Sequence, residues 1–449
     1  MGRLGDRQVF WLIAVFVVCI VLVVRTEPHL FGWFGPDGYW ATHWARDYSS
    51  GFVRRGLLGT LIQLPGGDPS DYAVIAIFSW VIALALMVVI ADALWRLTRP
   101  LARWQAATIL VIVLLSPVTS GMLIETLGDP IQLIVLVYVL LARHLLAGRR
   151  IGVITAVFAA FGLTMSLIHE AAVFFVLPAL FIQALMLRKG RGAWMAFAAC
   201  FISSAGGVAV LLLTNEAEPI TSNPALHLGD VTYIYPMQFD SFTNLLRDEL
   251  IRMFASGIGG YMETIARLGG AAALPVFLAL LLITFRHGLS RPWSGRQLAV
   301  IAAFILPALA IMPLLLVAHD WGRFFAYTFI ISMLAMADTA GEETAAPGRT
   351  VMLSFLGSGL LLAGLTTTDQ LALYRMDGLR MQPHLMLVSF AILLMARLMV
   401  MFSERRSGEQ QNASSDIQDT GLVDIIPPGD GISYRAQAGR SGRQRNTAP

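Results

Sequence analysis

The chain has 449 residues, of which 56% are hydrophobic and only 14% are charged, whereas charged residues make up about 25% of an ordinary soluble domain. This composition excludes a soluble globular protein and predicts a polytopic membrane protein. The net charge of +3 is too small to indicate a nucleic-acid partner. The two cysteines, Cys19 and Cys200, both fall in apolar stretches, which argues against a disulfide framework.

Apolar windows that could cross a bilayer as helices, with about 20 residues per crossing, occur about twelve times. We therefore expect an all-α fold, a polytopic transmembrane helical bundle of about 12 spans. The first window follows Arg3 and Arg7 without a small-residue cleavage site after it, so we interpret it as an uncleaved span. The windows lie near residues 8–24, 72–95, 105–124, 130–147, 151–168, 171–187, 193–213, 269–285, 297–317, 321–337, 351–368 and 385–403.

The orientation of the spans follows from the basic residues of the short loops, which stay on the cytoplasmic side. With about twelve spans, every basic cluster falls on one side of the membrane, and both termini are then cytoplasmic. The clusters are Arg96, Arg99 and Arg103; Arg143, Arg149 and Arg150; Arg188, Lys189 and Arg191; Arg286, Arg291 and Arg296; and Arg405 and Arg406.

The long polar segments divide the chain into two parts. Residues 1–403 form the expected transmembrane catalytic domain, with large outer loops at 25–71 and 214–268. Within the second loop, apolar residues at near-helical spacing between 245 and 258 predict an amphipathic helix on the outer leaflet. Residues 404–449 are rich in Ser, Gly, Gln, Arg and Asp without apolar periodicity, which predicts a disordered cytoplasmic tail.

Ionisable residues gather on the expected outer face, where the rule for basic loops does not explain them. Such groups cost a few kcal/mol at membrane depth unless they pair or line a wet cavity, so we expect a single polar cavity open to the outside. The arginines are Arg46, Arg54, Arg55, Arg323, Arg375 and Arg380, and the acids and histidines are Glu125, Asp129, His169, Glu170, His319 and Asp320.

The densest of these sites lies in the stretch WATHWARDYSSGFVRRGLLG, residues 40–59. On a helix the adjacent Arg54 and Arg55 would diverge by about 100° and reach two different oxygens. Arginine forks match phosphate oxygens, so this pair suits a diphosphate headgroup. The following RGLLGTLIQLP predicts a short apolar helix that re-enters the membrane or lies on it. The alternative is an interfacial helix whose arginines simply reach lipid phosphates.

Two further sites contain residue types that are suited to catalysis or binding. His319, Asp320 and Arg323 would share one helical face if a helix starts near Asp320, although a local ion pair that caps the helix explains them equally. His169 and Glu170 form a titratable pair between two apolar windows and have the residue types of a general base. A polar turn at the interface is the alternative there.

The remaining candidates are less specific. Glu125 and Asp129 lie between two windows, and Asp129 before Pro130 also fits a helix N-cap. Asp37 is first of all a turn residue. We find no metal-ligand spacing, P-loop or dinucleotide motif, and we expect neither a metal nor another cofactor.

The segments at Asp47–Leu57, His169–Glu170 and His319–Phe324, within a twelve-span layout, resemble the membrane polymerases and GT-C-type glycosyltransferases of bacterial cell-surface polysaccharide assembly, including O-antigen and exopolysaccharide polymerases. The resemblance implies an enzyme of the bacterial inner membrane whose active site faces the periplasm. It also implies a glycan donor linked to polyprenyl phosphate or diphosphate. The other expected partners are membrane lipids and further polysaccharide-assembly proteins. The acidic residue that acts as base in the first outer loop of GT-C enzymes would correspond to Asp47, or less well to Asp37. The paired carboxylates common in that family are absent from these loops.

The first expected function is therefore glycosyl transfer from a lipid-linked donor, with arginines holding the departing phosphate. The expected catalytic residues are Asp47, His169, Glu170 and Asp320, and the expected substrate-binding residues are Arg46, Arg54, Arg55, Glu125, Asp129, His319, Arg323 and Arg375. A twelve-span secondary transporter of a small anionic or sugar-like solute is the alternative, although the span interiors carry almost no ionisable groups. A structural scaffold for a surface-assembly complex is a third possibility.

Overall fold

The protein was analysed as a computed structural model, which describes residues 6–25, 30–49, 55–98, 103–115, 119, 122–145, 150–186, 191–214, 224–235, 251, 255, 306, 310 and 321–339. The chain divides into two units, 1–399 and 400–449, and every described residue belongs to the first. The predicted tail, the apolar windows near 269–285, 351–368 and 385–403, and most of the window at 297–317 lie outside the described residues.

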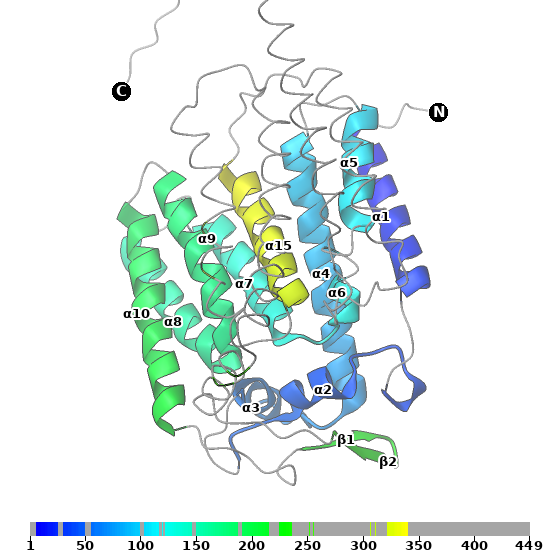
Figure 1. Ribbon diagram of the computed structural model, residues 1–449, viewed down its shortest axis with the longest axis vertical. Coiled ribbons are helices and arrows are strands. Elements are labelled where there is room, and N and C mark those ends of the chain that lie inside the picture. Colours follow the sequence, from blue (N-terminus) through cyan, green and yellow to red (C-terminus); the bar gives the residue numbers. More distant parts are fainter. Residues whose placement is uncertain are drawn as a thin grey trace, which may run out of the picture. The chain divides into compact units, whose positions relative to one another are not determined.

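Long apolar helices make up most of the described part of the chain (Figure 1). They are α1 (Asp6–Arg25), α4 (Tyr72–Thr98), α5 (Arg103–Leu115), α7 (Pro130–Leu145), α8 (Ile151–Ile168), α9 (Val173–Met186), α10 (Arg191–Thr214) and α15 (Trp321–Thr339). These positions confirm the helices predicted from the apolar windows over the same residues. Three of them, α4, α8 and α10, are long and apolar enough to cross a membrane. The prediction of a helical membrane protein is thus supported, and the count of about twelve spans stays a prediction.

Helix α4 is the central helix of the described bundle, in contact with α1, α5, α7 and α15. Asp71 caps its start by accepting a hydrogen bond from the Ala73 N–H at 2.9 Å. One face of α4, with Ile75, Leu86 and Ile90, is fully buried against these neighbours. The opposite face is apolar and exposed, as expected for a helix that packs on protein on one side and on lipid on the other.

The first long loop folds into short elements that lie across one end of the bundle (Figure 1). They are η1 (Leu30–Gly32), α2 (Gly38–Ala45) and α3 (Leu57–Gln63). Helix α2 contacts α3, α4 and α7, and α3 contacts α8. The short helix predicted from RGLLGTLIQLP is therefore present as α3. The helical geometry expected for Arg55 is wrong, because Arg55 has a left-handed φ of 64° in the turn before α3.

A β-hairpin departs from the all-α prediction. Strands β1 (Ala225–Leu228) and β2 (Val231–Ile234) pair antiparallel around Gly229 and Asp230. The hairpin is fixed to the start of α4, where the His227 N–H donates to the Ser70 carbonyl at 2.8 Å. The amphipathic helix predicted over 245–258 in the same loop lies almost wholly outside the described residues.

The opposite ends of α4 and α7 meet at a separate ionic group. Asp92 accepts from Arg96 and from Arg143, each at 3.2 Å. The orientation rule placed these two arginines on the same side of the membrane, and the structure joins them through one carboxylate. Which side that is remains a prediction.

Candidate functional site

The site begins with the way α2 is held in place. Asp37 caps this helix, because its Oδ1 accepts from the Trp40 N–H at 2.9 Å, which confirms its interpretation as a turn residue. The Trp44 indole N–H donates to the Gly128 carbonyl at 2.6 Å and ties α2 to the turn before α7. As a result, Trp40 and His43 on the same helix are fully buried.

The turn that carries Arg55 is fixed by a backbone contact between α2 and α3. The Gly59 N–H donates to the Arg46 carbonyl at 3.1 Å, and a Cβ on Gly59 would collide with that carbonyl. Only glycine allows this approach. The contact sets the distance between α3 and the end of α2. It therefore also fixes the position of Arg55, which lies in the turn just before α3.

Arg55 binds Glu170 through two prongs. Its Nη2 donates to Oε1 at 2.9 Å and its Nε to Oε2 at 3.4 Å, the planar fork geometry of a strong charge-assisted pair. Both side chains are about nine-tenths buried. Burial lowers the pKa of the Arg55 guanidinium, but the Glu170 carboxylate outweighs this effect and raises it overall, so Arg55 stays charged.

His43 lies directly beside this pair. Its Nε2 is 3.3 Å from Nη1 of Arg55. A guanidinium can only donate, so Nε2 is the acceptor and the neutral ring carries its proton on Nδ1. Burial, then the positive charge of Arg55, and then the electrostatic effects of His169, Arg46 and Arg323 hold the pKa of His43 well below its ordinary value of 6.5. His43 is therefore a neutral imidazole at pH 7.

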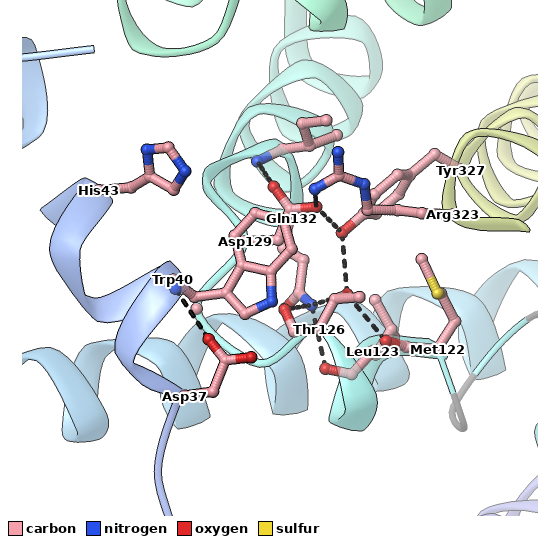
Figure 2. Close-up of polar contacts among 12 residues, drawn as sticks. Asp37, Trp40, His43, Met122, Leu123, Thr126, Asp129, Gln132, Arg323 and Tyr327 are labelled. Carbon is pink, nitrogen blue, oxygen red and sulfur yellow. Dashed lines mark hydrogen bonds and ion pairs between the residues drawn. The ribbon is translucent and has the colours of Figure 1, made fainter. Parts of the chain in front are cut away.

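A second buried ion pair joins α15 to the turn before α7, as Figure 2 shows. Arg323 donates through Nη1 to Asp129 Oδ2 at 3.3 Å, and the Tyr327 hydroxyl donates to the same oxygen at 2.9 Å. The other oxygen, Oδ1, accepts from the Ile131 N–H at 2.9 Å, which confirms Asp129 as the N-cap of α7. Burial raises the pKa of the Asp129 carboxyl, and Arg323, which favours the carboxylate, offsets only part of this rise.

Trp40 connects the two ion pairs. The Arg323 guanidinium carbon lies 4.6 Å from the centre of the Trp40 ring, a cation–π contact, and the Trp40 ring lies 5.8 Å from that of His43. In Figure 2 the Trp40 side chain reaches from α2 towards Asp129 and Arg323. Arg323 also acts electrostatically on Arg55, so the charges of the two ion pairs influence each other.

Gln132 fixes the turn that carries Asp129. Its Nε2 donates to the carbonyls of Leu123 and Thr126 at 3.0 and 2.8 Å, which sets the orientation of the amide. Thr126 Oγ1 is also 3.4 Å from the Tyr327 hydroxyl. The Asp129 carboxylate is therefore held from α7 and from α15 at the same time.

These groups form one assembly, which we call the buried ionic centre. It consists of His43, Arg46, Arg55, Asp129, His169, Glu170 and Arg323. Every arginine, histidine, aspartate and glutamate that is buried in the described part of the chain belongs to it. Guanidiniums outnumber carboxylates three to two among these buried side chains. Six of the ionisable residues that were expected to lie together do so, and they are buried: Arg46, Arg55, Asp129, His169, Glu170 and Arg323. The single polar cavity open to the outside stays a prediction.

Of the other described candidates, Asp47 and Glu125 lie outside the buried ionic centre, whereas Arg46 belongs to it. Asp47 is half-buried, and its carboxylate accepts from the Ser49 N–H at 2.7 Å and from the Gln63 amide, both outside the buried ionic centre. Glu125 is half-buried at the end of α6 (Met122–Glu125). Arg46 is buried at the end of α2 and belongs to the centre.

Five of the predicted residues lie outside the described part of the chain: Arg54, His319, Asp320, Arg375 and Arg380. The local pairing of Arg323 with Asp320 is therefore untested, and the described partner of Arg323 is Asp129. The described residues hold no group of three or more histidine, cysteine or carboxylate side chains that could bind a metal ion.

Sequence reasoning missed His43, Trp40, Tyr327 and Gln132. A signal for the first two was present: Trp40, His43 and Trp44 recur at helical spacing after Asp37, a capping residue. Tyr327 follows Arg323 by four residues and so shares its helix face. Gln132 carried no signal beyond its type.

Comparison with known proteins gives a family likeness for the first half of the chain. Residues 9–221 match the family described as "Uncharacterised membrane protein Rv1490". This range contains most of α1 and the described elements from α2 to α10, and so all of the buried ionic centre except Arg323. No curated protein and no solved structure matches the chain. The apolar helices and this likeness agree that the chain is a membrane protein.

Proposed function

We propose that this protein is a membrane glycosyltransferase, acting as a polysaccharide polymerase or a single-sugar transferase, which moves sugar from a polyprenyl-(di)phosphate-linked donor to an acceptor hydroxyl on the outer face of the inner membrane. The observation that carries the proposal is the buried ionic centre, in which one oriented guanidinium, Arg55, contacts a neutral imidazole and a second, Arg323, acts on it electrostatically. Such a centre offers fixed cations for a leaving phosphate and a base for a hydroxyl in the same place.

Arg55 and Arg323 are suited to hold the phosphate groups of the donor. Each guanidinium is oriented by a carboxylate, Arg55 by Glu170 and Arg323 by Asp129. A cation already fixed in place and shielded from water needs little reorganisation when negative charge develops on the leaving group. Arg46 adds a third buried positive charge near His43.

We assign the general base to His43. Glu170 is bound by both prongs of Arg55, which favours its ionised, weakly basic form. Asp47 bonds to Ser49 and Gln63 away from the arginines. His43 is neutral at pH 7, and its Nε2 carries the lone pair that faces Arg55. A phosphate that draws Arg55 towards itself would free this lone pair to accept a proton.

The proposed step forms one bond and breaks one. The acceptor oxygen bonds to the anomeric carbon as the bond from that carbon to the phosphate oxygen breaks. The electron pair of the broken bond leaves on the phosphate oxygen, next to Arg55 and Arg323. The hydroxyl proton moves to Nε2 of His43, so atoms and charge balance without any further reactant.

The test is a transfer assay in proteoliposomes with a polyprenyl-diphosphate oligosaccharide as donor. Wild type should release polyprenyl diphosphate and yield longer glycans, detected by mass spectrometry. Loss of a general base lowers rates by about 10²- to 10⁴-fold, and we expect a loss of this size for His43→Gln. His144→Gln is the matched control, because His144 is exposed near the far end of α7.

Two outcomes would contradict the proposal. If wild type gives no glycan product above that of empty liposomes, the chain is not such a transferase. If His43→Gln and His144→Gln both transfer at the wild-type rate, His43 is not the base. Uptake of a solute without covalent change would instead support the transporter alternative.

A further inference from the structure

Three tyrosines from the two long loops meet beside the buried ionic centre. Tyr39 comes from α2, and Tyr233 and Tyr235 come from β2 and its end. We call these residues the tyrosine cluster. The hairpin reaches α2 because it is fixed to Ser70, and Gly38 leaves room for it: a Cβ there would lie 2.6 Å from the Tyr235 ring.

Tyr39 connects this cluster to the proposed base. Its ring meets the His43 ring edge to face, with 4.7 Å between centres and an angle of 87°. It meets the Tyr235 ring at 6.2 Å and 64°. All three tyrosines are half-buried, whereas His43 is fully buried. The cluster therefore lies between solvent-accessible surface and the imidazole.

The chemistry of the cluster is that of a sugar-binding surface. A tyrosine ring presents a broad apolar face and a polar hydroxyl, which match the CH face and the hydroxyl groups of a pyranose. The Asp37 carboxylate acts on Tyr235 and adds a negative charge at this point. Negative charge disfavours a phosphate headgroup here, and the three hydroxyls disfavour a purely hydrocarbon ligand.

We propose that the tyrosine cluster binds a sugar residue of the glycan whose hydroxyl or anomeric carbon reacts at His43. The inference rests on the proposed function for the identity of that glycan. The lipid phosphate is then bound by arginines inside the buried ionic centre, and the saccharide by aromatic rings outside it. Tyr233 and Tyr235 are binding and positioning residues, because they lie beyond Tyr39 as seen from the base.

The inference is tested by direct binding, with detergent-solubilised full-length protein applied to an array of neutral and acidic oligosaccharides. Wild type should bind at least one glycan, and Tyr235→Ala should bind it roughly tenfold more weakly, the effect of losing one aromatic contact and its hydrogen bond. Tyr235→Phe keeps the ring and should retain most of the affinity. Ile234→Ala is the matched control, since Ile234 is the exposed last residue of β2, next to Tyr235.

The outcomes separate this inference from the proposed function. Absence of glycan binding by wild type, or equal binding by Tyr235→Ala and Ile234→Ala, would overturn the tyrosine cluster. Tyr233→Ala is a second variant if Tyr235→Ala does not fold, and it should weaken binding in the same direction. Binding that depends on the tyrosines in a protein without transferase activity would support the cluster and contradict the proposed function. If both alanine variants transfer sugar with an unchanged KM for the acceptor, the proposed function is supported and the role of the tyrosine cluster is contradicted.

Discussion

Arg55 and Glu170 are separated by 115 residues in the sequence and joined by a two-pronged ion pair with a shortest N–O distance of 2.9 Å. The pair links the turn before α3 to the turn between α8 and α9, and so fixes the first long loop onto the helical bundle. Because both side chains are almost fully buried, removing one partner would leave the other as an unpaired buried charge, which costs more stability than at an exposed site.

The first prediction concerns this pair. Arg55→Leu or Glu170→Leu alone should lower stability by about 3–5 kcal/mol, since each leaves a buried charge without its partner. The double variant should recover most of that loss, because it leaves no buried charge unmatched. Thermal unfolding in detergent measures the four proteins of this cycle. A double variant as unstable as the sum of both single variants would show that the pair does not act as a unit.

The second prediction separates the two roles of Asp129. Asp129→Asn keeps an oxygen that can accept from the Ile131 N–H but removes the charge opposite Arg323. Asp129→Ala removes both interactions. Loss of the cap should make Asp129→Ala less stable than Asp129→Asn by about 1 kcal/mol. Equal unfolding midpoints for the two variants would contradict the capping role.

The third prediction concerns the contact between α2 and α3. Gly59→Ala places a methyl group against the Arg46 carbonyl and should break the hydrogen bond between the two backbones. We expect a marked fall in both stability and activity, because α3 must shift away from α2. Gly152→Ala is the control, since Gly152 lies in α8 with no atom within 4 Å of the added methyl. It should be neutral or stabilising by up to about 1 kcal/mol. Equal behaviour of both variants would contradict the proposed close contact.

The fourth prediction concerns pH. His43 has a folded-state pKa below 6.5 because it is buried near Arg55, His169, Arg46 and Arg323. Below pH 6.5 the unfolded chain therefore binds a proton at this residue that the folded protein does not. Stability should fall as the pH drops from 6.5 towards the folded pKa and should level off below it.

The control for this prediction is His43→Gln, which cannot titrate. Its unfolding free energy should vary less than that of wild type between about pH 7.5 and about pH 5.5, one unit on either side of the ordinary pKa. The difference between the two slopes, measured by denaturant unfolding, isolates His43 from the other titrating groups. Identical slopes for wild type and His43→Gln would show that the imidazole is not held neutral.

The helices were predictable because bilayer thickness fixes the length of an apolar helix. The windows near 72–95 and 151–168 correspond closely to α4 and α8, with ends that differ by no more than a few residues. The hairpin was not foreseen, although Gly229-Asp230 between Leu228 and the β-favouring stretch Val231–Ile234 is a recognised hairpin signal.

The sequence predicted which residues belong to the candidate site better than it predicted which of them bind each other. Arg55, Glu170, Asp129 and Arg323 were identifiable because a charge in an apolar setting requires a partner. Their partners depend on how loops return to the bundle, which local spacing does not determine. Asp129 and Arg323 lie 194 residues apart, for example. His43 was missed although its helical spacing with Trp40 and Trp44 after Asp37 indicated a helix, because that spacing does not show what the buried face of the helix contacts.

The central claim is that the buried ionic centre binds the lipid-linked phosphate. An ion pair at the other end of the bundle provides a control for it. Arg96 and Asp92 form a pair there that resembles Arg55 and Glu170 in composition but is about one-third exposed. The variants Arg55→Gln/Glu170→Gln and Arg96→Gln/Asp92→Asn each remove one guanidinium and one carboxylate. The second variant also removes the carboxylate that Arg143 binds.

The most direct measurement is the shift in Tm of these proteins when polyprenyl diphosphate is added in detergent micelles. A ligand at a hundred times its Kd stabilises the folded state by about 2.7 kcal/mol. We predict a clear rise in Tm for wild type and for Arg96→Gln/Asp92→Asn, and none for Arg55→Gln/Glu170→Gln. An equal rise in all three proteins, or no rise in wild type, would contradict the assignment of the buried ionic centre as the phosphate site.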